Sequence, residues 1–243
     1  MRSTYVPESN FIMRDQIVPE QNFAGHKALV TGGSRGIAAD ISRALARKGA
    51  FVAVNFSAAA DNKMGKVDAA QRLVDEICAD GGQAVAIEQD LMVEGGGAQL
   101  VEKAREAIGP VDTLLLSASV QYHIPFLRQT SCNVADQLRI NLHANIEILQ
   151  AVLPDMLSTH YGRILTVGSI QEVSPSPEMP IYSMSKSAMK NLVENIALQS
   201  AGQGVVINNI APGLIETDRN AFRRDDRDAW NEAQKSANPL GRA

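Results

Sequence analysis

Short apolar runs alternate with longer amphipathic stretches along most of this chain. The apolar runs are rich in Val, Ile and Leu, which is typical of parallel strands buried on both faces, and the longer stretches have the period of helices. The predicted strands are residues 29–31, 51–56, 83–88, 111–117, 163–168 and 204–210, and the predicted helices are residues 37–48, 67–79, 98–108, 134–158 and 182–201.

This alternation predicts a single α/β domain with a doubly wound parallel (Rossmann) sheet and with ligands at the carboxyl ends of its strands. Residues 25–243 are assigned to this domain. Residues 1–24 contain charged residues and prolines but no long apolar run. They are therefore predicted to form an N-terminal arm and not a signal peptide.

The composition narrows the class of protein. The 243 residues are 45% hydrophobic and 21% charged, with a formal net charge of −4. Mild acidity without a basic stripe argues against nucleic acid or an anionic membrane as a partner. Cys78, Cys132 and the four histidines show no metal-ligand spacing, so no metal site is predicted. Two reduced thiols are expected of a cytoplasmic protein.

A glycine turn joins the first predicted strand to the first predicted helix. It reads Thr31-Gly32-Gly33-Ser34-Arg35-Gly36-Ile37-Ala38. Gly32 and Gly36 allow a tight turn and close approach of a pyrophosphate, whose charge the N–H groups of a helix N-terminus can meet. An ordinary strand-to-helix turn is the alternative interpretation of this motif alone.

A second pattern lies further along, where Tyr182 precedes Lys186 by four positions and follows Ser169 by thirteen. On a helix, the offset of four places both side chains on one face. A free tyrosine has a pKa of about 10, and lowering it to about 7 requires about 4 kcal/mol of phenolate stabilisation. An adjacent ammonium can supply it, so the pattern predicts a proton-transferring tyrosine.

Together these segments resemble the short-chain dehydrogenase/reductase family, whose pattern is a Thr-Gly-x-x-x-Gly-x-Gly turn, an Asn on a middle helix, a Ser and Tyr-x-x-x-Lys. Asn141 fills the third position, and the resemblance covers residues 23–242, including Asp90-Leu91 and Pro212-Gly213. It implies an NAD(P)-dependent oxidoreductase that interconverts a carbonyl and a secondary alcohol by hydride transfer. The implied catalytic residues are Tyr182 as general acid/base, Lys186 to lower the Tyr182 pKa and bind the nicotinamide ribose, Ser169 to hold the carbonyl oxygen, and Asn141 to anchor a water.

The resemblance also bears on the cofactor. Asn55 occupies the position, nineteen past Gly36, where NAD-dependent folds carry a carboxylate. With Arg35 in the turn as a phosphate clamp, this favours NADP over NAD. The implied cofactor-binding residues are Gly32, Ser34, Arg35, Gly36, Ile37, Asn55, Ser57, Asp90, Leu91, Ser117, Ala118, Ser119, Tyr182, Lys186, Pro212, Gly213, Ile215 and Thr217.

The sequence departs from the family pattern at three places. Ala38 replaces the third turn glycine and is small enough to fit. The run 116–119, Leu-Ser-Ala-Ser, replaces Asn-Asn-Ala-Gly, and Ser119 lacks the freedom of glycine at positive φ. The family continues past the counterpart of Ala243 with another helix and a seventh strand. Because an unpaired edge strand is a liability, a truncated sequence with its C-terminal strand missing is expected.

The substrate is predicted less directly. Gln121, His123, Gln171 and Glu172 are expected near the pocket and could bind hydroxyls, which favours a sugar, polyol or other hydroxylated small molecule. A 3-oxoacyl thioester reductase is the alternative enzyme. A dinucleotide-binding sensor or scaffold without turnover is an alternative of another class, and it would not need the complete acid/base set.

Two further expectations concern assembly and closure. The resemblance implies a homodimer or homotetramer that pairs through the two long helices, with Ala144, Ile148, Ala151, Ala188 and Leu192 on the pairing faces. The charged segment 214–238 follows the cofactor cleft. It is predicted to be a mobile lid, hinged near Gly213 and near residues 239–241.

Overall fold

The computed structural model describes residues 23–237 and 240–241. The predicted arm, except for its last two residues, and part of the second predicted lid hinge lie outside the described residues. The strands are β1 (Lys27–Val30), β2 (Phe51–Phe56), β3 (Gln83–Glu88), β4 (Thr113–Leu116), β5 (Gly162–Val167) and β6 (Val205–Ile210). The α-helices are α1 (Gly36–Arg47), α2 (Ala58–Lys63), α3 (Ala69–Ala79), α4 (Gly96–Ile108), α5 (Ser131–Leu138), α6 (Ala144–Ser158), α7 (Pro180–Ser200) and α8 (Arg227–Ala237).

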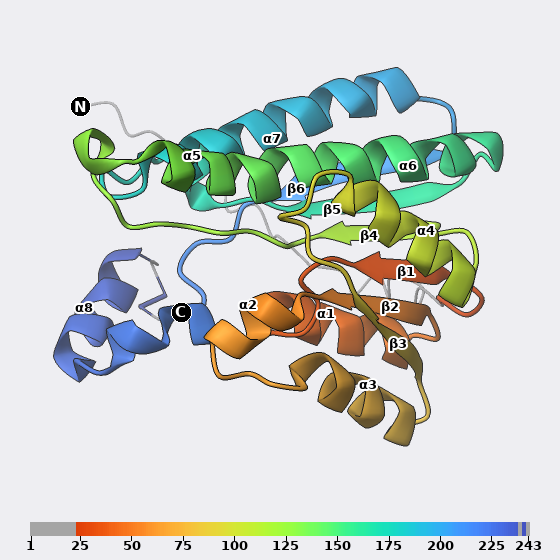
Figure 1. Ribbon diagram of the computed structural model, residues 1–243, viewed down its shortest axis with the longest axis horizontal. Helices are drawn as coiled ribbons and strands as arrows, with labels where there is room; N and C mark the ends of the chain where they lie inside the picture. Colours follow the sequence, from red (N-terminus) through yellow and green to blue (C-terminus); the bar gives the residue numbers. More distant parts are fainter. Residues whose placement is uncertain (1–22, 238–239, 242–243) are drawn as a thin grey trace, which may run out of the picture.

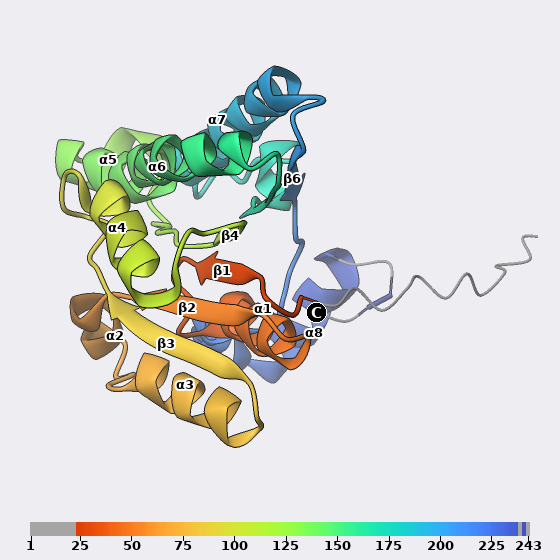
Figure 2. The same ribbon diagram turned by 90° about the vertical axis from the view of Figure 1, so that its right-hand side faces the viewer.

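All six strands form one parallel sheet in the order β3-β2-β1-β4-β5-β6. Helices α4 to α7 cover one face, and α1 to α3 cover the other (Figures 1 and 2). The order reverses between β1 and β4, and ligands of doubly wound sheets bind at such a switch point, beyond the carboxyl ends of the strands. The predicted fold class is confirmed.

Each face of the sheet has its own hydrophobic core. Leu29, Leu114, Ile148 and Val152 belong to the core under α4, α6 and α7. Val30, Val52, Val54 and Leu73 belong to the core under α1 and α3. Because neighbouring residues of β1 serve opposite cores, the central strand is buried on both sides, as its apolar run predicts.

Strand β6 lies at one edge of the sheet and is only partly buried. Its side chains alternate between buried Val205 and Ile207 and exposed Val206 and Asn208. Within the described residues it pairs only with β5. The seventh strand that the family pattern implies is not among these residues.

The predicted helix 134–158 is divided in the structure. Thr130 Oγ1 accepts a hydrogen bond from Asn133 N and caps α5 at a start before the predicted one. A π-helical turn, Arg139–His143, then separates α5 from α6. Turns of this kind are frequent at functional sites, and this one contains Asn141.

The predicted pairing faces are partly wrong. Ala144 and Ile148 are completely buried within the monomer, so they are unable to contact a second copy. Ala151 and Leu192 pack partly against the same core. Only Ala188, on α7, is exposed among the predicted residues. The hydrophobic face of α6 packs against the sheet, which buries Ala144 and Ile148.

After β6 the chain leaves the layers. A 3₁₀ helix, Asp218–Arg224, leads into α8, which Figure 1 places beyond the carboxyl ends of the strands. Trp230 is 7% exposed and lies 6.0 Å from the guanidinium of Arg223. Over the described residues, no helix is long and apolar enough to cross a membrane.

Candidate active site

The glycine turn after β1 has the shape that a pyrophosphate site requires. Gly32 and Gly36 have φ of 59° and 54°, values that side chains rarely allow. A Cβ on Gly32 would lie 3.0 Å from the Cα of Ala118. The turn therefore packs its backbone directly against the loop after β4. The N–H groups of Gly32 and Gly33 bind Asn55, so the groups suited to an anion are those at the start of α1.

Two buried polar side chains support this turn. Thr31 Oγ1 accepts hydrogen bonds from Ser117 N (2.9 Å) and Ala118 N (3.1 Å). Asn55 Oδ1 accepts one from Gly32 N (3.2 Å). Asn55 is 2% exposed and its amide donates to the carbonyl of Gln89 (3.1 Å). Asn55 is therefore buried and holds the glycine turn against the end of β3 through its side-chain hydrogen bonds.

The predicted phosphate clamp has a partner that sequence analysis missed. Arg35 Nε lies 3.0 Å from Asp61 Oδ1, and Ser34 Oγ donates to the same oxygen at 3.4 Å. Asp61 is 4% exposed on α2, and its Oδ2 has no hydrogen-bond partner within the described residues. Arg35 also donates to Met64 Sδ. A carboxylate therefore does stand beside the clamp, although it comes from six positions after Asn55.

The predicted acid/base pair lies on α7, which begins with Pro180 at its first position. Tyr182 and Lys186 are each 6% exposed. Lys186 Nζ lies 5.6 Å from the centre of the Tyr182 ring and donates to the carbonyl of Val167 at 2.7 Å. The predicted shared face is present, and the ammonium is anchored on β5.

Ser169 lies two residues after the end of β5 and caps a short 3₁₀ helix, Ile170–Glu172. Its Oγ accepts from Gln171 N at 3.2 Å, and its own N–H donates to Glu172 Oε1 at 2.9 Å. Both halves of a capping box are thus formed. The carboxyl end of β5 and the middle of α7 meet here, which brings Ser169 to the same edge as Lys186.

Asn141, the fourth predicted catalytic residue, lies in the π-helical turn. It is 1% exposed, and its side chain exchanges two 2.9 Å hydrogen bonds with the backbone of Val120. It also donates to Ser185 Oγ at 3.0 Å. Asn141 therefore fixes the loop after β4 against α7.

The remaining predicted cofactor residues lie around the carboxyl edge of the sheet. Asp90 Oδ1 accepts from Met92 N at 2.9 Å, and Ser57 Oγ caps α2 through Ala60 N at 3.3 Å. Leu91 is buried, and its carbonyl accepts from Arg139 Nε at 3.1 Å. Ser119 is not among the described residues with positive φ, so the replacement of glycine there causes no backbone strain.

The predicted lid segment touches the glycine turn at its first residues. A Cβ on Gly36 would lie 3.6 Å from the side chain of Thr217. Asp218 Oδ2 forms an ion pair with Lys66 Nζ at 3.1 Å. The carbonyl of Pro212 accepts from Ile170 N at 2.9 Å, whereas Gly213 and Ile215 are exposed.

A structural ion pair supports the loop that carries Asp90 and Leu91. Glu147 receives both guanidinium branches of Arg139, at 2.8 and 2.6 Å, and the N–H groups of Gly95 and Gly97. The Arg139 hydrogen bonds, followed by those from Gly97 and Gly95, hold the pKa of Glu147 below its ordinary value against the opposite effect of burial.

The expected hydroxyl-binding residues do not all remain available. Gln171 Oε1 accepts from Ser183 Oγ at 2.6 Å, and both oxygens of Glu172 bind protein donors. His123 pairs with Glu178 at 3.5 Å. In the same loop Tyr122 donates to Asp136 Oδ2 at 3.1 Å, and burial with this bond raises the pKa of Tyr122. Apart from the local capping box between Ser169 and Glu172, these contacts join residues far apart in the sequence and leave no trace in its spacing.

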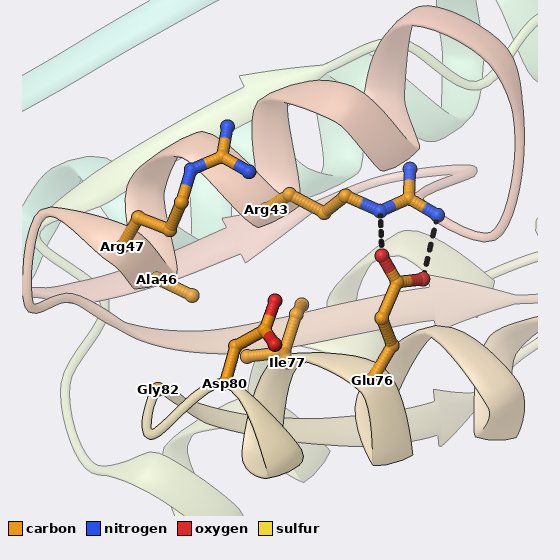
Figure 3. A pocket seen from close by; sticks show the side chains of 7 residues that line it. All are labelled: Arg43, Ala46, Arg47, Glu76, Ile77, Asp80 and Gly82. Carbon is orange, nitrogen blue, oxygen red and sulfur yellow. Dashed lines mark hydrogen bonds and ion pairs between the residues drawn. The ribbon is translucent and has the colours of Figure 1, made fainter.

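Two concavities differ in their relation to these residues: the first lies away from them, and Gln171, Glu172 and Ser183 line the second. The hollow between α1 and α3, closed by the Arg43–Glu76 ion pair, has a volume of about 10 Å³ and holds no more than a water (Figure 3). An open groove of about 550 Å³ runs between η3 (Ile170–Glu172) and α7, beside Pro177 and Met184. No cluster of three His, Cys, Asp or Glu side chains within the described residues could hold a metal, and Cys78 and Cys132 are exposed thiols.

Known proteins are similar to this chain in sequence and in fold. The family model of the short chain dehydrogenases matches residues 26–228. The chain is 31% identical over 223 residues to the 3-oxoacyl-[acyl-carrier-protein] reductase FabG of Escherichia coli K12, covering 91% of this chain and 86% of the relative.

Solved structures agree with these matches. A 3-oxoacyl (acyl-carrier-protein) reductase from Agrobacterium tumefaciens C58 with NADP bound has a TM-score of 0.85 and 36% identity, covering 95% of this chain and 88% of the other. A protein from Beutenbergia cavernae, provisionally named an NAD(P)-dependent gluconate 5-dehydrogenase, has a TM-score of 0.79 and 29% identity, covering 88% and 82%. With the glycine turn, the serine after β5 and the tyrosine and lysine of α7 in one fold, the chain belongs to the short-chain dehydrogenase family.

Proposed function

We propose that this protein is an oxidoreductase that reduces a carbonyl group to a secondary alcohol, and catalyses the reverse oxidation, with NADP as cofactor. The observation that carries this proposal is the burial of Tyr182 and Lys186 on one face of α7, with the lysine ammonium held against the strand that leads to Ser169. A buried phenol beside a cation is suited to proton transfer.

Each residue of the group has a distinct task. Tyr182 donates a proton to the substrate oxygen in reduction and accepts it in oxidation, while Lys186 favours negative charge on the phenol oxygen. The Oγ of Ser169 already accepts from Gln171 N, so its hydroxyl proton is oriented to donate to the carbonyl oxygen. Asn141 holds the loop after β4 and is proposed to anchor a water that leads toward Lys186.

The residues present fit a dinucleotide phosphate. NADPH, when bound, supplies the hydride. The positive-φ glycines leave room for its pyrophosphate, and Arg35 beside Ser34 provides a cation for its 2′-phosphate. The relatives crystallised with NADP support this choice, as does the absence of a carboxylate at position 55. Asp61 weakens the preference for NADP, because its negative charge offsets the positive charge of Arg35.

We propose a sugar, polyol or other hydroxylated compound as the substrate, for which Gln121 supplies a polar contact and His123 supplies one on exchanging its Glu178 partner for the ligand. A 3-oxoacyl thioester is a second candidate, which the similarity to 3-oxoacyl-[acyl-carrier-protein] reductases favours. Oxidation of NADPH measured against sugars, diketones and 3-oxoacyl thioesters separates the two classes. A protein that binds NADPH but turns over no member of this panel would be a sensor or scaffold instead.

Assembly, closure and location complete the proposal. We expect at least a homodimer through α6 and α7, using exposed α7 residues such as Ala188 and Leu198 in place of the buried residues. Light scattering at micromolar concentration checks this, because a monomer would contradict it. The segment 214–238 is proposed to act as a lid over the cofactor. A cytoplasmic location stays a prediction.

A further inference from the structure

The carboxylate of Glu172 is shared between the catalytic turn and the edge strand. Its Oε1 accepts from the backbone N–H of Ser169 at 2.9 Å, and its Oε2 accepts from Asn209 Nδ2 at 2.9 Å. Asn209 Oδ1 in turn accepts from Thr166 Oγ1 at 2.6 Å. One chain of hydrogen bonds thus runs from β5 through β6 to Ser169.

The backbone leaves a specific space for this carboxylate. A Cβ on Gly168 would lie 1.6 Å from Glu172 Oε1 and 2.8 Å from Asn209 Oδ1. Any other residue at this position would displace the glutamate. The glycine before Ser169 is therefore required by the side chain that returns to Ser169.

Two backbone hydrogen bonds join the same segments. Gly168 N donates to the carbonyl of Ile210 at 2.7 Å, and Ile170 N donates to that of Pro212 at 2.9 Å. The carbonyl of Glu172 also accepts from Ser187 Oγ on α7 at 3.1 Å. The Ser169 turn is consequently fixed to β6, to the root of the lid and to the helix of Tyr182.

We propose that Glu172, held by Asn209, is a positioning residue that orients Ser169 for the reaction. This inference rests on the proposed role of Ser169 in binding the carbonyl oxygen. Removing the carboxylate leaves the Ser169 N–H and the Asn209 amide without their acceptor, which frees the extended backbone conformation that directs the serine side chain. Misplacement of a reacting group by about 1 Å can lower turnover about 100-fold.

The test is a double-mutant cycle with Ser169→Ala, Glu172→Ala and the double variant. The readouts are kcat and KM for the first carbonyl of the panel that the wild type reduces with NADPH, and the Kd of NADPH from its fluorescence. Glu172→Ala should lower kcat about 10- to 100-fold and leave the Kd of NADPH within about twofold. In the Ser169→Ala background the same change should have less than about a twofold further effect.

Two more variants serve as controls. Gln at position 172 can accept from Ser169 N and donate to a reoriented Asn209, because the hydroxyl of Thr166 both donates and accepts. Glu172→Gln should therefore restore kcat to within about threefold of the wild type. Glu194→Ala removes an exposed carboxylate that pairs with Lys190 on α7, and it should change nothing.

Equal losses from Glu172→Ala in both backgrounds, or no loss in the wild type, would overturn the positioning role while leaving the proposed function intact. An unchanged kcat in Ser169→Ala would instead refute the proposed role of the serine itself.

Hydrogen exchange provides a reading that needs no substrate. The amides of residues 168–173 should exchange faster in Glu172→Ala and at the wild-type rate in Glu172→Gln, and equal protection in all three proteins would overturn the tether. If Glu172→Ala does not fold, Asn209→Ala replaces it, because it removes only the partner of Oε2; unchanged exchange and kcat in that variant would contradict the proposal.

Discussion

The ammonium of Lys186 donates to the carbonyl of Val167 at 2.7 Å, across the interface between α7 and β5. Val167 is the last residue of β5, and Ser169 follows it by two positions. The same bond therefore holds the lysine near Tyr182 and fixes the distance between the acid/base helix and the serine turn. A buried ammonium favours a nearby phenolate strongly, because little water screens its charge.

The first prediction concerns Tyr182. Tyr182→Phe removes the titratable hydroxyl and keeps the ring that packs beside Lys186. Turnover should fall about 100- to 10,000-fold, since general acid/base catalysis contributes factors of that size. The Kd of NADPH should stay unchanged. Steady-state kinetics with fluorescence titration measures both, and a wild-type kcat in this variant would contradict the mechanism.

The second prediction concerns the cofactor clamp. Arg35→Ala should raise the Kd of NADPH about 10- to 100-fold, as expected for a charge-assisted hydrogen bond to phosphate, and change that of NADH little. Arg43→Ala is a matched control on α1, the helix that follows Arg35, because Arg43 lies away from the turn and forms an ion pair of 2.8 Å with Glu76. Comparable losses for NADPH and NADH would rule out a contact with the 2′-phosphate.

The third prediction follows from the buried partner of the clamp. Asp61→Asn keeps an acceptor for Arg35 Nε and removes the negative charge 3.0 Å from it. The site then carries one more positive charge toward the 2′-phosphate, so NADPH should bind about 3- to 10-fold more tightly. Affinity for NADH should not change. Weaker NADPH binding would mean that Arg35 needs the charged carboxylate to keep its orientation.

The sequence predicts the framework of this protein better than the surroundings of its site. Parallel strands buried on both faces are recognised in the sequence as apolar runs. The glycine turn and the Tyr182–Lys186 spacing are also local patterns. Asp61 has no such pattern, and the Ser169-x-x-Glu172 spacing indicates a local capping box but not the bond from Glu172 to Asn209. Each acts through a contact that folding creates, Asp61 on the short helix α2 and Glu172 through a neighbouring strand.

The predicted pairing face illustrates the same limit. Ala144 and Ile148 occupy a helix face whose apolar character is equally suited to a partner or to the sheet, and the structure assigns it to the sheet. Periodicity identifies an apolar face but not its neighbour. In the same way, spacing alone placed Gln171 and Glu172 near a substrate, whereas their side chains bind Ser183, Ser169 and Asn209.

The fourth prediction uses the lowered pKa of Glu147. A carboxylate whose folded pKa is depressed stabilises the protein above its unfolded pKa of about 4.3, and this contribution is lost as the pH falls through the folded value. Glu147→Gln should therefore lower the free energy of unfolding by about 2 kcal/mol at neutral pH, where Arg139 loses its ionised partner.

The difference between Glu147→Gln and the wild type should shrink in acid, as the wild type itself loses the ionised form. Urea unfolding at pH 7 and at successively lower pH measures the two curves. As a control, Glu106→Gln alters an exposed residue of α4 and should change the free energy of unfolding by no more than about 0.5 kcal/mol at any of these pH values. A constant difference at all pH values would show that the carboxylate charge is not the source of the stabilisation.

The last prediction concerns the proposed lid. Its first residues already contact the cofactor side of the domain, because Thr217 lies against Gly36 and Asp218 pairs with Lys66 at 3.1 Å. Beyond them, the exposed and charged α8 keeps only Trp230 buried. A segment attached at its root and weakly packed elsewhere should become ordered when a ligand fills the space beneath it, and closure would exclude water from Tyr182. Amides of residues 216–237 should exchange more slowly with saturating NADPH and substrate, while those of the distant helix α3 should not change. Equal exchange in the segment with and without ligands would show that it is a fixed surface feature and not a lid.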